Sequence, residues 1–178
     1  RMTLNQPAQA LAVMELMMRS GRLTREPELI QLARLYLYQD IPYKAARLLE
    51  DAMKAGQVRK SADNRTLLAT AWALARERDQ AIRSYRLAAQ ASTSADVDFT
   101  LAQLYLEDER WTDAARTLEK ALEKPDLKTP GTAWLLLGIA LYELESAGPA
   151  REAFNRAAGY ADSGKTARQW LEHLDQQS

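Results

Sequence analysis

Apolar and small residues recur along the chain at helical spacing, and short polar turns interrupt each run. In the segment 132–158, apolar residues lie three or four positions apart, stop at the turn 145–148, and then resume. Side chains at this spacing share one face of an α-helix. The segment therefore predicts two short helices joined by a tight turn.

The same pattern occurs four times in the same register. In every copy the first Leu precedes the small residue after the turn by 13 positions, as Leu32 precedes Ala45. The copies begin at residues 26, 62, 95 and 131, at intervals of 36, 33 and 36 residues. Each copy also has a small residue directly after that Leu, where a partner helix would cross: Ala33, Ala69, Ala102 and Gly138.

The fourth copy carries the most specific motif. Its key residues are Trp134, Leu137, Gly138, Leu141, Ala150, Phe154 and Ala157. This motif resembles the tetratricopeptide repeat (TPR), which has a period of about 34 residues. The other copies hold Leu29, Arg65 and Asp98 where the family has its first Trp. The resemblance implies an all-α fold, a TPR superhelix of stacked antiparallel helix pairs (an α-solenoid).

The repeats set the expected domain organisation. They occupy residues 26–59, 62–94, 95–128 and 131–164. Residues 1–25 are expected to form the second helix of a truncated preceding repeat or an N-terminal cap, and residues 165–178 a C-terminal capping helix. The opening residues do not look like a natural start, so we interpret the chain as a piece of a longer protein.

Helix boundaries are marked by Pro and Gly. Pro42 and Pro130 are expected to begin helices, Pro130 with Thr129 as N-cap. Gly21 and Gly56 are expected to end helices.

The amino-acid composition excludes several kinds of functional site. Apolar residues make up 47% of the chain and charged residues 27%, a balance typical of a globular protein. The absence of Cys excludes disulfides, thiolate metal sites and Cys nucleophiles, and it fits both the cytoplasm and the periplasm. No apolar run approaches the roughly 20 residues that a membrane helix needs, so no span is expected in this chain.

Charge is unevenly distributed although the net charge is zero. Residues 1–95 carry 15 basic and 9 acidic side chains, and residues 96–178 carry 9 basic and 15 acidic ones. One interpretation is scatter over a solvated surface. The other is a dipolar molecule that docks end-on or offers two differently charged faces.

Motifs for catalysis or cofactor binding are weak. His173, the single histidine, lies in the expected cap without evident catalytic or metal-binding partners. The stretch 163–166 has part of a phosphate-loop motif but lacks its upstream Gly and preceding strand. No basic stripe is interleaved with aromatic residues, as a nucleic-acid surface would be. We therefore expect no enzyme activity, no cofactor, no metal and no nucleic-acid partner.

The TPR resemblance implies a different kind of site, a concave groove lined by the first helix of each pair. Such a groove binds an extended peptide or a helix of a partner protein. The repeat register places the following residues at or near it: Gln31, Arg34, Tyr38, Thr66, Thr70, Thr100, Gln103, Glu107, Tyr142 and Glu143.

A narrower resemblance concerns residues 32–58, 110–124 and 167–174, which are similar to bacterial repeat proteins that accompany TonB-type energy-transduction operons. It implies a periplasmic protein that works with TonB–ExbB–ExbD components; a cytoplasmic location stays open. An alternative function is a structural spacer or a dimerisation segment. In that case the chain would form a homodimer through its Met-rich N-terminal helix, with Met14, Met17 and Met18.

Overall fold

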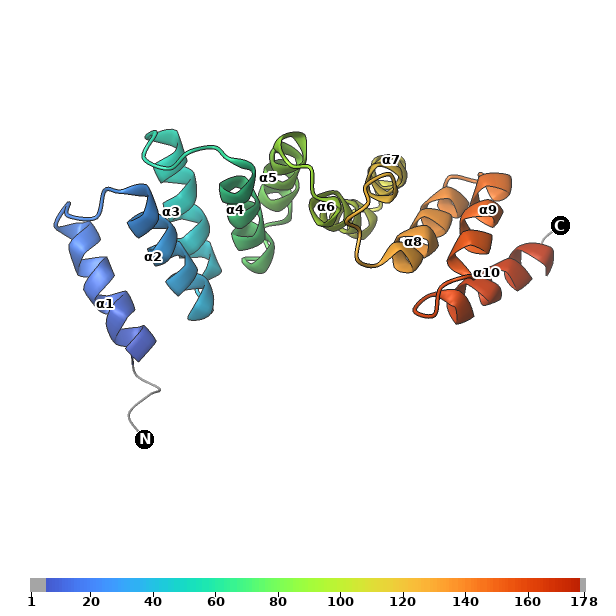
Figure 1. Cartoon of the computed structure of the whole chain (residues 1–178), viewed down its shortest axis with the longest axis horizontal. Helices are drawn as coiled ribbons and strands as arrows, with labels where there is room; N and C mark the ends of the chain where they lie inside the picture. The colour runs from blue at the N-terminus through green and yellow to red at the C-terminus, as the bar shows by residue number, and fades with distance from the viewer. Residues whose placement is uncertain (1–5, 177–178) are drawn as a thin grey trace. The chain divides into compact units, whose positions relative to one another are not determined.

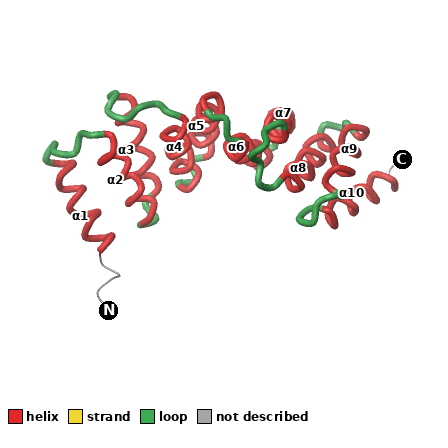
Figure 2. Tube along the Cα trace, in the orientation of Figure 1, coloured by secondary structure: helices red, strands yellow, loops and turns green. Residues whose placement is uncertain are grey.

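The computed structural model describes residues 6–176, and within this range the chain forms ten α-helices and no strand (Figure 1, Figure 2). The contacts between Cα atoms divide the chain into two compact units, residues 1–91 and 92–178. Each unit has its own set of packed helices. The predicted all-α class is confirmed.

Unit 1 is built from consecutive helices that pack on one another in chain order. They are α1 (Gln6–Arg19), α2 (Glu26–Tyr38), α3 (Pro42–Lys54), α4 (Ala62–Leu74) and α5 (Arg78–Ala91). Helices α2 and α3 form the pair of repeat 1, and α4 and α5 form the pair of repeat 2.

Unit 2 follows the same order. Its helices are α6 (Ala95–Glu107), α7 (Trp111–Leu122), α8 (Pro130–Glu143), α9 (Ala147–Ala157) and α10 (Gly164–Gln176). Helices α6 and α7 form the pair of repeat 3, α8 and α9 form the pair of repeat 4, and α10 packs on both α9 and α8.

Small residues lie where the helices cross, as the register predicts. Ala33, Ala69 and Ala102 are completely buried. Gly138 is the tightest of these positions, because a Cβ atom there would lie 2.5 Å from ring carbons of Phe154. Contacts this close require the smallest side chains, since extra atoms in a packed core force neighbours to move. The predicted helix register is confirmed.

All four repeats turn from their first to their second helix in the same way. The fifteenth residue of each repeat has a left-handed backbone conformation with φ between 53° and 59°: Asp40, Arg76, Glu109 and Glu145. The next N–H then donates to a carbonyl five residues back, at 2.8–3.0 Å. This bond satisfies a carbonyl at the end of the first helix, which offsets the cost of the left-handed residue.

The predicted helix boundaries agree with the structure except at one cap. Pro42 and Pro130 are the first residues of α3 and α8. Gly21 and Gly56 follow α1 and α3 with φ of 70° and 74°, which L-residues rarely adopt. Thr129 is the N-cap residue of α8, but its side chain accepts no capping hydrogen bond.

The last helix, α10, packs on repeat 4. Leu174 is 4% exposed and shares a core with Phe154 and Ala150, while Trp170 and Leu171 pack against that core. The rings of Trp170 and Phe154 stack with centroids 5.4 Å apart. The outer face of α10 is polar, and its role as a C-terminal cap stays a prediction.

The N-terminal helix is held to repeat 1 by a polar contact. The Tyr36 hydroxyl donates to Glu15 at 2.7 Å, and Lys44 Nζ donates to the same carboxylate at 3.1 Å. These bonds lower the pKa of Glu15. Burial and the Glu15 contact raise the pKa of Tyr36 above its ordinary range. On the other side of α1, Val13 and Leu16 are 58% and 68% exposed.

Candidate partner-binding surfaces

The ten residues predicted to line a groove all belong to the first helix of a repeat pair. Five of them lie in each unit. Unit 1 contributes Gln31, Arg34, Tyr38, Thr66 and Thr70. Unit 2 contributes Thr100, Gln103, Glu107, Tyr142 and Glu143. All ten are half-buried or exposed.

In unit 1 the structure brings Gln31 and Arg34 into one pocket between α2 and the beginning of α4. We call it the inner pocket; its volume is about 460 Å³. Its lining is Glu26, Pro27, Ile30, Gln31, Arg34, Arg59, Ser61, Asp63 and Asn64. Tyr38, Thr66 and Thr70 lie outside this lining.

One wall of the inner pocket is a fixed polar cluster. Arg59 Nε donates to Glu26 at 2.8 Å, and Asn64 Nδ2 donates both to the other Glu26 oxygen at 2.8 Å and to the Arg59 carbonyl at 2.9 Å. The hydrogen bond from Arg59 is the main reason that the pKa of Glu26 is lowered. Glu26 therefore stays ionised and engaged with its own neighbours.

Sequence reasoning missed this cluster. Glu26 and Asn64 lie 38 residues apart, close to one repeat period, so the period itself brings the first turns of α2 and α4 together. Ser61 at the N-cap accepts a hydrogen bond from the Asn64 N–H at 3.3 Å, which orients the start of α4. A search for polar pairs one period apart could have found these residues.

Arg34 has a different environment. Its side chain is exposed, and it forms no ion pair within residues 6–176. A guanidinium in this state can form two parallel hydrogen bonds with a carboxylate. Gln31 is also exposed, beside the half-buried Ile30. The inner pocket thus combines an available cation, an amide and apolar surface.

The predicted threonines have local hydrogen bonds. Thr66 donates to the Ala62 carbonyl at 2.9 Å, and Thr100 donates to the Asp96 carbonyl at 2.8 Å. Both bonds run back along the residue's own helix, a common arrangement for Thr inside helices. The Thr70 and Tyr85 hydroxyls lie 3.0 Å apart.

In unit 2, helix α10 lies against one of the predicted residues. The ring of Tyr142 packs against Trp170 with centroids 5.2 Å apart, and the Tyr142 hydroxyl lies 3.2 Å from His173 Nε2. This contact makes His173 part of the packing between α10 and α8. Gln103, Glu107 and Glu143 stay exposed on α6 and α8.

Within the described residues there is no group of three or more His, Asp or Glu side chains placed to ligate a metal ion. The helices described in residues 6–176 are too short and polar to cross a bilayer. The surfaces of both units that could contact a partner are exposed faces of helices.

Comparison with known proteins places this geometry among solved repeat structures. No model of a known protein family matches the sequence, and no curated protein matches it. YrrB, described as a TPR protein with an unusual peptide-binding site, superposes with a TM-score of 0.74 at 14% identity, over 96% of this chain and 86% of YrrB. The chain has the tetratricopeptide-repeat fold.

Two further structures agree with this TPR fold. The MamA protein superposes with a TM-score of 0.71 at 20% identity, over 88% of this chain and 84% of MamA. The C-terminal part of a TPR protein from Cytophaga hutchinsonii gives 0.71 at 15% identity, over 96% of this chain and 66% of that one. Identities this low establish the fold, and the narrower resemblance to TonB-associated proteins stays a prediction.

Proposed function

We propose that this TPR chain is a non-catalytic scaffold that binds a peptide or helix of a partner protein, and that the inner pocket of unit 1 is its principal contact. The observation that carries the proposal is Arg34, an exposed guanidinium at a pocket that also holds Ile30 and Gln31. YrrB, which has the same fold, is described with a peptide-binding site.

The pocket has the composition that peptide recognition requires. Its volume of about 460 Å³ lies within the roughly 300–1,000 Å³ range of ligand sites. Pro27 and Ile30 supply apolar surface, while Arg34 and Gln31 supply donors that fix orientation. The Glu26–Arg59–Asn64 cluster holds one wall rigid, which lowers the entropy that binding must remove.

Peptide binding provides the test. Peptides selected from a random phage-displayed library against the whole chain would be labelled, and their binding measured by fluorescence anisotropy. We expect Arg34→Glu to weaken binding about tenfold or more, since truncation of an anchor residue typically costs above 1 kcal/mol. Gln31→Ala should have a smaller effect in the same direction.

The matched control is Arg86→Glu, the same change at an exposed residue of α5 outside the inner pocket. It should leave binding within twofold of the wild type. If Arg34→Glu and Arg86→Glu behave alike, the inner pocket is not the binding surface.

The partner and compartment are the finer part of this proposal. The resemblance to TonB-associated proteins points to a periplasmic protein that binds TonB–ExbB–ExbD components. Binding of the purified periplasmic domains of TonB and ExbD to the chain can be measured by the same anisotropy assay. If neither domain binds, the proposed TonB–ExbB–ExbD partnership is wrong, whereas the proposal of a peptide-binding scaffold is unaffected.

A second candidate function is dimerisation through α1. The observation that favours it is the exposed apolar face of this helix, where Val13 is 58% and Met18 41% exposed. Static light scattering should then give the mass of a dimer, and Met14→Glu with Met18→Glu should return a monomer. A monomeric wild-type chain would exclude this function.

A further inference from the structure

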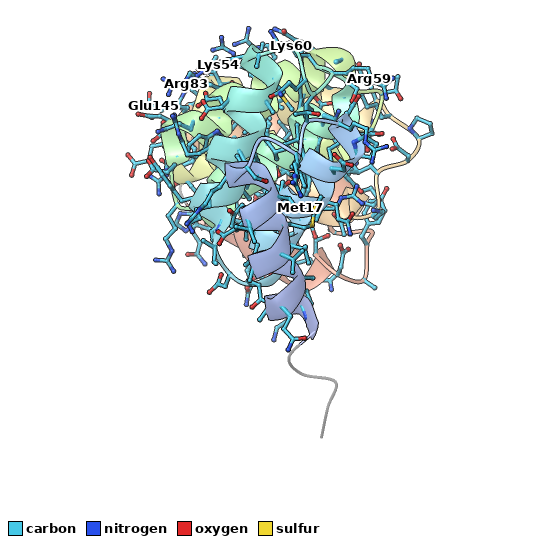
Figure 3. The ribbon with its side chains drawn as sticks, turned by 90° about the vertical axis from the view of Figure 1, so that its left-hand side faces the viewer. Met17, Lys54, Arg59, Lys60, Arg83 and Glu145 are labelled. Carbon is cyan, nitrogen blue, oxygen red and sulfur yellow. The ribbon has the colours of Figure 1, made fainter. Side chains whose placement is uncertain are left out.

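A second pocket of unit 1 lies between α3, α4 and α5, and we call it the outer pocket. Its volume is about 470 Å³. Its lining is Glu50, Met53, Lys54, Lys60, Arg65, Leu68, Trp72, Gln80, Arg83, Ser84 and Leu87. Lys54, Lys60 and Arg83 lie near one another along the same edge of the molecule in Figure 3.

The outer pocket shares no residue with the inner pocket. Its contacts on α4 are Arg65, Leu68 and Trp72, whereas Thr66 and Thr70 belong to the predicted groove. At 3.6 residues per turn, these two sets point about 150° apart around the helix. A ligand in the outer pocket therefore contacts the side of α4 away from the groove.

The floor of the outer pocket is apolar and its rim is exposed. Met53, Leu68 and Trp72 are buried, at 6%, 9% and 2% exposed, whereas Leu87 at the rim is 49% exposed. An exposed Leu beside a cavity floored by Trp and Leu is an arrangement that favours insertion of one large apolar side chain.

The charge around this floor is strongly positive. Lys54, Lys60, Arg65 and Arg83 surround it, against the single carboxylate of Glu50. Glu50 is already paired, with Arg47 at 3.3 Å and Lys54 at 3.4 Å.

Two of the four cations are available to a ligand. Lys60 and Arg83 are exposed and form no ion pair within residues 6–176. The unit as a whole is basic, because residues 1–95 have a net charge of +6 and residues 92–95 carry none of it. An approaching acidic segment would be attracted to this unit and oriented by the pocket.

The repeat register places an unusual residue in the lining of the outer pocket. Arg65 occupies the fourth position of repeat 2, where repeat 4 has Trp134. Instead of filling the space with a ring, Arg65 extends to the carbonyl of Leu87 and donates a hydrogen bond at 2.9 Å. A flexible cation thus lies where the repeat motif has a bulky aromatic.

We propose that the outer pocket binds an acidic segment of a partner protein. One large apolar side chain of that segment packs on Leu68 and Trp72, and flanking carboxylates pair with Lys60 and Arg83. This is a second interaction surface, separate from the inner pocket.

The test uses a defined probe and the whole chain. The probe is a short fluorescein-labelled peptide with Leu and Phe at its centre and Glu on both sides. We expect binding that weakens steeply with salt, as pairing of exposed charges requires. Arg83→Glu should weaken it tenfold or more, and Arg65→Trp, which fills the cavity, should abolish it. Thermal melting must show that both variants stay folded.

The controls distinguish binding at the outer pocket from binding at the inner pocket and from attraction to the net positive charge of the unit. Arg86→Glu makes the same charge change on α5 outside the pocket, and Arg34→Glu makes it at the inner pocket; both should keep binding within about threefold. A probe with Ser in place of Leu and Phe should bind tenfold more weakly.

Three outcomes would overturn the proposal. One is equal loss of binding in Arg83→Glu and Arg86→Glu. Another is unchanged binding in a folded Arg65→Trp variant. The third is self-association of the chain, seen by light scattering, that Arg83→Glu abolishes, because the occupant would then be a second copy. The effect of Arg34→Glu on binding of the phage-selected peptides is measured separately. That result tests only the proposed function of the inner pocket.

Discussion

Repeats 2 and 4 have the same turn between their two helices, yet they fill the space between their helices differently. In repeat 4 the fourth residue is Trp134, and the guanidinium of Arg156 lies 5.1 Å from its ring centroid. In repeat 2 the fourth residue is Arg65, and the residue matching Arg156 is Leu87. The cation and the apolar side chain have exchanged helices.

The exchange changes which side chains line the space beside the two helices of a repeat. An aromatic ring on the first helix fills it and lets the second helix cover the ring with a long cation. An Arg on the first helix reaches across to a backbone carbonyl and lines the pocket beside its apolar floor. The remaining repeats have Leu29 at this position, and Asp98, which is buried and paired with Lys124.

The largest expected effect tests the closed core of repeat 4. Phe154 is completely buried and stacks on Trp170. Phe154→Ala should lower the free energy of unfolding by about 3–5 kcal/mol, through lost burial and the cavity left behind. Urea denaturation followed by circular dichroism measures this. Leu87→Ala is the comparison in repeat 2, and because Leu87 is 49% exposed its loss should stay below about 1 kcal/mol.

Equal losses in Phe154→Ala and Leu87→Ala would mean that repeat 4 is no better packed than the rim of the outer pocket. The contrast between the two repeats would then be wrong.

The next effect tests how closely the helices of repeat 4 approach. Gly138→Ala puts a Cβ 2.5 Å from the Phe154 ring, so we expect a loss of about 1–3 kcal/mol from overpacking. Gly148→Ala is the matched control, since a Cβ there meets nothing within 4 Å. The control should be neutral or stabilising by up to about 1 kcal/mol. A Gly138→Ala chain as stable as the control would contradict the contact.

Filling the outer pocket should change stability less than Gly138→Ala does, and it should stabilise the chain rather than destabilise it. Arg65→Trp gives repeat 2 the residue of repeat 4, and filling a cavity commonly stabilises a protein by about 0.5–2 kcal/mol. The melting temperature should therefore rise while peptide binding at the outer pocket is lost. Arg65→Ala separates these effects, because it removes the hydrogen bond to Leu87 without filling the space. A lower melting temperature in Arg65→Trp than in Arg65→Ala would show that the cavity cannot accept a ring.

Most of the fold could be predicted from the sequence, and the reason is physical. Ala33, Ala69 and Ala102 recur at intervals of 36 and 33 residues because helix crossings tolerate only small side chains, so the spacing itself encodes the packing. The packing face of α10 was predictable for a similar reason, since Trp170 and Leu174 face the core while Glu172 and Asp175 face solvent.

The binding surfaces were less predictable, because they depend on how side chains pair after folding. The register placed Thr66 and Thr100 on the predicted face, but it could not reveal that their hydroxyls bond to their own helices. The lining of the outer pocket includes a departure from the motif at Arg65. A departure can be read in the sequence, but whether it leaves a cavity depends on the conformation that its side chain adopts.

The smallest predicted effect concerns the cation over Trp134. Arg156→Ala should cost about 0.5–1 kcal/mol, the usual contribution of an exposed cation–π contact. Arg156 also pairs with Glu152 at 3.5 Å, an exposed pair that should contribute little. A double-mutant cycle of Arg156→Ala with Trp134→Leu isolates the ring contact, and one with Glu152→Ala isolates the ion pair. We expect coupling in the first cycle to exceed that in the second. The reverse result would mean that Arg156 is held by charge, and that the exchange with Leu87 has no part in closing repeat 4.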